Sequence, residues 1–179
     1  EAVALQQSPG VALSTPIGIP EYSFQLPAHL QGRRASRVAV YKSWQEPMDG
    51  GWTRWVFDQH KLQYDTLHDA DIKGGRLDRR YDAILFQTQS PASIKNGLEP
   101  ASTPPEYAGG LGAEGMAALK AFVEAGGRLV AVEEATEFVA ELFQLPVKSA
   151  VEGLRNTEYY IPGSILRLDL DTTTELATG

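Results

Sequence analysis

Hydrophobic and polar positions are most clearly ordered between residues 114 and 136, where a helical pattern is followed by an apolar run. Large apolar residues recur there at three- and four-residue spacing, opposite charged ones: Met116, Leu119, Phe122 and Val123. This spacing predicts an amphipathic helix with one buried stripe. Gly126 and Gly127 predict its end, because glycine readily takes the left-handed conformation of a helix C-terminus. The apolar run at 129–132 then predicts a strand covered on both faces, as in a parallel sheet.

Similar patterns predict the rest of a sheet and two further helices. Short apolar runs predict strands at Val38–Tyr41, Tyr64–Leu67 and Ala83–Phe86. One helix is predicted from the turn after Pro47 to about His60, with Asp49 as its N-cap, and another over about 137–143. Leucines alternate with charged residues at 166–170, which predicts a half-exposed edge strand whose orientation is left open. Together these elements predict an α/β three-layer sandwich with about five mostly parallel strands.

Two proline-containing stretches fall outside this pattern. Residues 1–36 are interpreted as a proline-rich linker or the tail of a preceding domain, and 37–179 as the α/β domain. The second stretch, 91–113, is predicted to be a long loop that leaves the carboxyl end of a strand. Loops of this length in compact domains are usually functional or form an interface. Parallel α/β folds place their sites at this edge of the sheet.

Composition narrows the classes of function. The chain has 179 residues and a net charge of -7, which suits one domain and argues against a nucleic-acid or anionic-membrane surface. It contains no cysteine, which excludes disulfides, thiolate metal sites and a cysteine nucleophile but leaves the compartment undecided. No apolar run approaches the ~20 residues of a membrane span, and no signal peptide opens the sequence. Since it begins at Glu1, the sequence is expected to be a piece of something longer.

A glycine motif offers one candidate for nucleotide binding. Gly110, Gly112 and Gly115 have the spacing G-x-G-x-x-G, and Glu133 follows at the end of the next predicted strand. Such a motif should leave a strand directly, whereas here two prolines precede it. A loop followed by a helix start is therefore the preferred interpretation.

The histidines give no metal motif. His29, His60 and His68 have no second histidine at helical or strand spacing, and no zinc-binding pattern includes them. The segment 68–71 carries a histidine and two aspartates, which are possible nitrogen and oxygen ligands. It is interpreted as a solvated loop, and no metal site is predicted.

Polar residues at strand ends are the remaining candidates for catalysis. Ser43 and Ser90 stand where a nucleophile could, but the sequence identifies no base for either, and strand-end serines more often cap helices or loops. Glu133 and Glu134 could form a carboxylate pair for acid–base work. Adjacent residues leaving a strand point to opposite faces, so at most one of them is expected to face a cleft.

The tryptophans divide into two groups. Trp52 and Trp55 are three residues apart on a predicted helix and are interpreted as core. Trp44 lies at a strand end and is the better candidate for contact with a ligand, although aromatic side chains at strand ends commonly just cover the sheet.

Several blocks of sequence together resemble one protein family. They lie in order at residues 48–55, 67–72, 81–85, 104–110, 119–127 and 162–166. With them the chain, over about 37–176, resembles the C-terminal domain of large bacterial zinc carboxypeptidases of the carboxypeptidase A-like metallopeptidase family.

This resemblance implies a fold and a parent protein. The fold it implies is flavodoxin-like, similar to class I glutamine amidotransferases, and the parent is a secreted zinc peptidase. The zinc ligands of that family belong to an upstream peptidase domain, so no cofactor is expected in this fragment. The amidotransferase catalytic triad requires a cysteine, which this sequence lacks.

The resemblance and the residues support three hypotheses about function. The preferred one is a non-catalytic accessory domain that docks the upstream peptidase domain of the same chain or helps it to bind substrate. The alternative is a small-molecule or carbohydrate-binding domain with a strand-end cleft, whose candidate residues are Ser43, Trp44, Gln89, Ser90 and Glu133. An independent serine hydrolase is the third.

Overall fold

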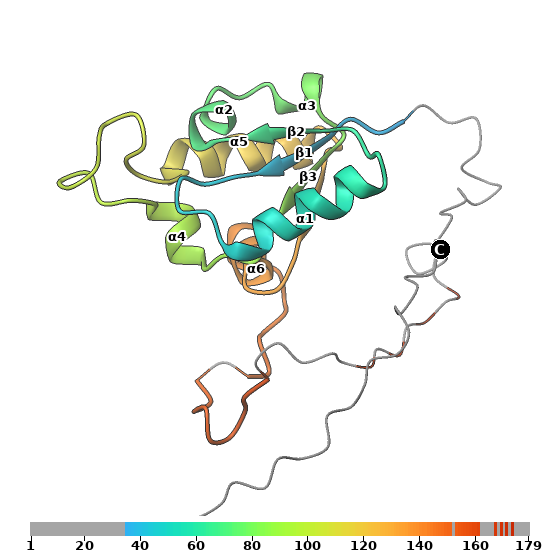
Figure 1. The fold of residues 1–179 in the computed structure, drawn as a ribbon, viewed down its shortest axis with the longest axis vertical. Coiled ribbons are helices and arrows are strands. Elements are labelled where there is room, and N and C mark those ends of the chain that lie inside the picture. The colour runs from blue at the N-terminus through green and yellow to red at the C-terminus, as the bar shows by residue number, and fades with distance from the viewer. Residues whose placement is uncertain are drawn as a thin grey trace, which may run out of the picture. The chain divides into compact units, whose positions relative to one another are not determined.

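The computed structural model describes residues 35–151 and 153–161, together with the single residues 167, 169, 171 and 173 (Figure 1). The predicted proline-rich linker, except for its last two residues, lies outside the described residues. The edge strand predicted at 166–170 also lies largely outside them, so a fifth strand stays a prediction.

The described strands form one open sheet in which all neighbours are parallel. They are β1 (Val38–Tyr41), β2 (Tyr64–Leu67), β3 (Ala83–Phe86) and β4 (Arg128–Ala131), in the order β2-β1-β3-β4. The predicted α/β class with a parallel sheet is confirmed. β1, β2 and β3 have the predicted bounds, and β4 lies one residue earlier than predicted. This strand order is consistent with a flavodoxin-like layout.

Helices connect the strands throughout the described part of the chain. They are α1 (Met48–Gln59), α2 (Asp69–Lys73), α3 (Leu77–Arg80), α4 (Pro91–Asn96), α5 (Gly112–Glu124) and α6 (Ala135–Phe143). α1, α5 and α6 were expected from their patterns. Gly126 ends the α5 region with a φ of +94°, and the Gly127 N–H donates to the Phe122 carbonyl at 2.9 Å. The predicted glycine stop is confirmed.

Two of the shorter helices, α2 and α4, replace segments predicted as loops, and α3 lies where no element was predicted. α2 and α3 occupy most of 69–80, and α4 begins the long loop 91–113. Helices of four to six residues are too short to show a periodic apolar stripe, and side-chain caps hold the starts of α2 and α4 instead. The Asp71 carboxylate accepts from the His68 N–H at 2.9 Å in α2. The Ser90 hydroxyl accepts from the Ser93 N–H at 3.2 Å in α4.

The N-cap predicted for α1 is wrong. Pro47 is the N-cap residue, and Asp49 lies inside the first turn. There its carboxylate faces the positive end of the helix dipole, which is the same electrostatic preference that makes aspartate common at helix starts.

The main core lies on the side of the sheet that faces α5. Alternate residues of each strand point into it, and it is completed by side chains of the helices α2 to α6: Ala39, Tyr41, Leu67, Ile72, Leu77, Tyr81, Ile84, Phe86, Ile94, Leu111, Leu119, Phe122, Ala135, Phe138 and Leu142. Figure 1 shows α1 in front of the strands and α5 behind them. The sheet therefore separates two helical layers, of which the α5 layer is the thicker.

The α1 side of the sheet is incompletely covered, which corrects two predictions. β4 was predicted to be covered on both faces, yet Val130 and Val132 are 48% and 45% exposed. Trp52 and Trp55 were interpreted as core, yet their exposed fractions are 65% and 51%. Periodicity identified the apolar residues correctly. It could not show that α1 has no helical neighbour over β4 among the described residues.

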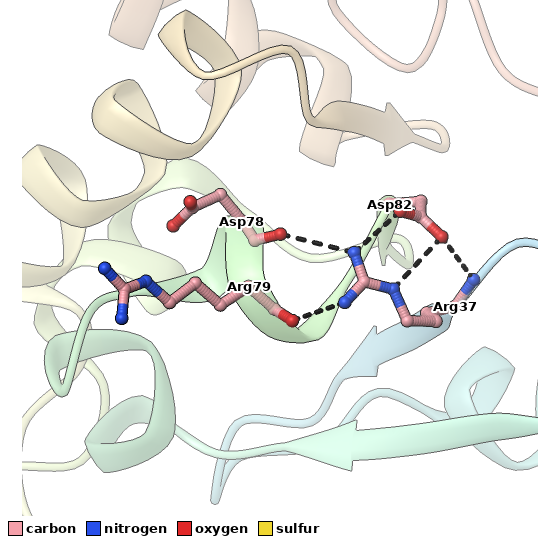
Figure 2. A network of polar contacts seen from close by, with 4 residues as sticks. All are labelled: Arg37, Asp78, Arg79 and Asp82. Atoms are coloured by element: carbon pink, nitrogen blue, oxygen red, sulfur yellow. Dashed lines mark hydrogen bonds and ion pairs between the residues drawn. The ribbon is translucent and has the colours of Figure 1, made fainter.

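An arginine ties the start of β1 to the segment before β3. Figure 2 shows the Arg37 guanidinium between the Asp82 carboxylate and the carbonyls of Asp78 and Arg79. The Arg37 Nη2–Asp82 Oδ1 distance is 2.8 Å, and the Arg37 backbone N–H donates to Asp82 Oδ2, also at 2.8 Å. This network fixes the amino-terminal edge of the sheet, which leaves the carboxyl edge for a site.

Candidate functional site

The carboxyl ends of the four parallel strands meet at one edge of the sheet. β1 leads into Ser43 and Trp44, β2 into His68 and Asp69, β3 into residues 87–90, and β4 into Val132 and Glu133. The sequence-predicted candidates therefore all follow strand ends: Ser43, Trp44, Gln89, Ser90 and Glu133. Their contacts, however, separate them into different local roles.

Ser43 and Gln89 are bonded to each other. The Gln89 side-chain amide donates to the Ser43 hydroxyl at 2.7 Å and to the Gln45 carbonyl at 3.1 Å. Both side chains are buried. The pair joins the connections that follow β1 and β3, and its polar groups are used in holding the two strand ends together.

Ser90 acts as a helix cap. In addition to accepting from the Ser93 N–H, its hydroxyl donates to the Ser93 hydroxyl at 3.0 Å. Neither Ser43 nor Ser90 is hydrogen-bonded to a histidine within the described part of the chain. The nucleophile–base contact that a serine hydrolase needs is not formed here.

Trp44 is the centre of an aromatic cluster. Its ring stacks on the His68 ring, with centroids 3.9 Å apart and planes 4° from parallel. Tyr107, from the loop before α5, meets the Trp44 ring edge-on at 4.7 Å. Trp44 remains 41% exposed, so part of the indole is open to a ligand. His68 was predicted to lie in a solvated loop, and that prediction is wrong.

A buried tyrosine–aspartate pair lies next to this cluster. The Tyr41 hydroxyl donates to Asp69 Oδ1 at 2.6 Å. Burial raises the pKa of Asp69, while the Tyr41 hydrogen bond and the electrostatic effects of Lys73 and His68 oppose that rise. Burial also raises the pKa of Tyr41, and Asp69 adds to the effect. Sequence reasoning missed this pair because Asp69 follows β2 in a polar stretch that gives no sign of burial.

The raised pKa of Asp69 predicts a pH dependence of stability. The folded chain binds this proton more tightly than the unfolded chain does. The free energy of unfolding should therefore fall as pH rises from the ordinary carboxyl range near 4 through the folded pKa, and then level off. Asp69→Asn keeps an acceptor for Tyr41 and should lack this fall. Urea unfolding of both proteins across this pH range checks it, and parallel curves would contradict it.

Removing the Tyr41 hydroxyl should destabilise the buried Asp69 carboxylate. Tyr41→Phe removes the donor from a buried carboxylate and should lower the free energy of unfolding at neutral pH by about 1–3 kcal/mol. The loss of unfolding free energy caused by Tyr41→Phe should grow with pH, because the ionised Asp69 carboxylate depends on this hydrogen bond more than the protonated carboxyl does. A cost that is equal at acid and neutral pH would show that the hydroxyl contributes only packing.

Glu133 lies on a different part of the edge. Its φ is +52°, an uncommon value for a residue other than glycine, in the turn from β4 into α6. Its carbonyl accepts from the Thr136 N–H at 2.9 Å and from the Thr136 hydroxyl at 2.6 Å, which holds the turn. Glu133 also lines a concavity at this edge, and Glu134 lies outside it. This agrees with the expectation that at most one of the two faces a cleft.

That concavity has a volume of about 340 Å³ and lies between α1 and the ends of β3 and β4. Its lining combines apolar side chains with a few polar ones: Asp49, Trp52, Thr53, Val56, Phe57, Gln87, Thr88, Val132 and Glu133. The Gln87 amide donates to the Gly50 carbonyl at 3.3 Å, which anchors α1 at this end. Trp44 is not among the lining residues, so Trp44 and Glu133 do not share this concavity.

The glycine motif before α5 has packing explanations. Gly110 lies against the backbone of Gly97 and Ile94, and Gly112 has a φ of +54° at the helix start. The motif follows a loop instead of a strand, as its prolines suggested. Within the described residues no group of three or more metal-ligating side chains is close enough to hold a metal ion. No helix in that part of the chain has the length and apolarity needed to cross a membrane.

Comparisons with known proteins give no relative. No protein-family model, no curated protein and no solved structure matches this chain.

Proposed function

We propose that this chain is a non-catalytic accessory domain that docks a partner domain through the α1 face of its sheet. The observation that carries the proposal is the exposed apolar surface on that face, formed by Trp52, Trp55, Val56, Val130 and Val132. Several large apolar side chains exposed on one face are typical of an interaction surface, and three of them, Trp52, Val56 and Val132, line one concavity. The polar groups of Ser43, Gln89 and Ser90 form hydrogen bonds within the fold, which also favours a role other than catalysis.

The resemblance in sequence supplies the proposed partner. It is the peptidase domain of a secreted zinc carboxypeptidase, belonging to the same polypeptide and holding the zinc. On this proposal the domain has the flavodoxin-like, amidotransferase-like fold of that family, with a fifth strand, and works outside the cytoplasm.

Binding measurements between separately produced domains test the proposal. Trp52→Ser should weaken the binding of the peptidase domain by about tenfold or more, as for a central apolar residue of an interface. Trp44→Ser is the matched control, because it removes the same side chain from the strand-end cluster and should leave affinity within about twofold. Calorimetric titration measures both. Equal losses, or no binding by the unaltered chain, would refute the proposal.

A small-molecule or carbohydrate-binding function is the second candidate. It is favoured by the concavity beside Glu133, where an indole, an amide and a carboxylate converge as in many ligand sites. Its test is equilibrium binding of mono- and disaccharides to the chain and to Glu133→Gln. Saturable binding that Glu133→Gln abolishes would favour this candidate over docking.

A further inference from the structure

The cover over the α1 face declines stepwise from β1 to β4, and on the other side of β1 the β2 partner of Val40, Thr66, is also exposed. Val40, Leu85 and Val130 are register partners on β1, β3 and β4 and so form one row. Their strand neighbours Ala39, Ile84 and Leu129 point into or against the α5-side core, so this row faces α1. Val40 is fully buried, Leu85 is half-buried and Val130 is 48% exposed. Among the residues that the structure describes, the cover is therefore missing over β4.

The strip of the sheet left uncovered is about as wide as one helix. Neighbouring strands lie about 4.8 Å apart and a helix with its side chains is about 10 Å wide, so one helix covers about two strands. α1 covers the β1 part of the face, which leaves a strip over β3 and β4. Trp52 and Val56 are four residues apart on α1 and both line the concavity with Val132. We call this strip, together with the concavity at its strand end, the groove. α1 borders it, Val132 lines the concavity just after β4, and Val130 of β4 lies further along the strip, outside the concavity.

The charges at one end of this groove favour a partner segment with cationic side chains. Asp49 and Glu133 both line the concavity, and among its described lining residues none is a lysine, arginine or histidine. Trp52 lines the same concavity, and Trp55 meets its ring edge-on, with centroids 6.0 Å apart. An apolar surface with carboxylates and indoles at its rim suits an apolar stripe flanked by cationic side chains.

We infer that the groove between α1 and β4 binds an amphipathic helix of the partner, with its apolar stripe on Val130 and Val132 and a lysine or arginine near Asp49 and Glu133. Parallel sheets are normally covered by helices on both faces, and this helix would complete the layer that α1 begins. The inference rests on the proposed docking function and names the element that docks. The α1 helix has 12 residues, so the matching helix is about 18 Å long.

Selection from a displayed library of random peptides of about 16 residues, roughly four helical turns, tests this inference on the chain itself. Enriched peptides should carry apolar residues at i, i+3 or i+4, and i+7, with more lysine and arginine than acidic residues. The best synthetic peptide should lose about tenfold in affinity for Val132→Ser, and for the double variant Asp49→Asn, Glu133→Gln. Val147→Ser is the control, because Val147 is an exposed valine outside the groove, and it should leave affinity unchanged.

Other outcomes overturn the inference and remain distinguishable from failure of the proposed function. Enriched peptides with period-two alternation would indicate strand addition at the edge of β4. A dimer of the unaltered chain that Trp52→Ser dissociates would assign the face to a second copy. Failure to enrich any peptide, or equal binding to Val132→Ser, would also refute it. Helical basic peptides together with no binding of the peptidase domain would support the groove while refuting the proposed function, so the two failures are distinguishable.

Discussion

Replacing Gly97 with alanine is expected to destabilise the folded chain by about 3 kcal/mol or more. Gly97 has a φ of +58° and a ψ of -143°, a region that is essentially restricted to glycine. An added Cβ would lie 1.9 Å from the Gly109 carbonyl oxygen and 2.6 Å from the Gly110 nitrogen. These are backbone atoms, so relief requires the loop before α5 to move away from α4.

Gly109→Ala is the matched control. Gly109 also has a positive φ, +77°, but nothing lies within 4 Å of its added Cβ. Only the left-handed conformation should then cost energy, about 1–2 kcal/mol. Urea unfolding followed by circular dichroism gives both values. Equal costs would mean that the Gly97–Gly109 contact yields easily and that the loop is only loosely attached to α4.

Phe86→Ala is expected to cost about 3–5 kcal/mol of the free energy of unfolding. Phe86 is fully buried at the centre of the core, with ring centroids 4.7 Å from Tyr41 and 5.7 Å from Phe138. Its removal leaves a cavity between the sheet and α6 and loosens the ring that carries the Asp69 hydrogen bond.

Two variants make that prediction measurable even if the alanine form fails to fold. Phe86→Leu keeps most of the volume and should cost less than the alanine variant does. Phe57→Ala removes the same side chain from a half-buried position on α1, where the ring meets the Tyr64 ring edge-on at 5.4 Å. It should cost less than Phe86→Ala. An equal or larger cost for Phe57→Ala would contradict the assignment of the main core to the α5 side of the sheet.

The strands and long helices could be predicted because their sequence signals are local. An unbroken apolar run such as Ala83–Phe86 specifies a strand by itself, and α5 shows its stripe over several turns. α2, α3 and α4 are too short to show a period, and only α2 and α4 begin at a side-chain cap. Exposure could not be predicted for Trp52 or Val130, because periodicity shows which residues share a face and gives no information about what lies over it.

The candidate site divides in the same way. The position of Ser43, Trp44 and Glu133 at one edge follows from parallel topology alone and was predictable. The stacking of Trp44 on His68, and the approach of Tyr107, join segments that are distant in sequence. No local pattern encodes such pairings. Asp69 was missed for a related reason, since its burial depends on Tyr41 from another strand.

The strand order also bears on how the sheet forms during synthesis on the ribosome. β2 pairs with β1, β3 adds to the free side of β1, and β4 adds to β3, so each new strand finds its partner already made. A nascent chain stopped after β3 already holds a three-stranded sheet with β1 paired on both sides. Loss of β4 would remove one edge strand from the four-stranded sheet, whereas loss of β1 would leave β2 and β3 without the strand that joins them.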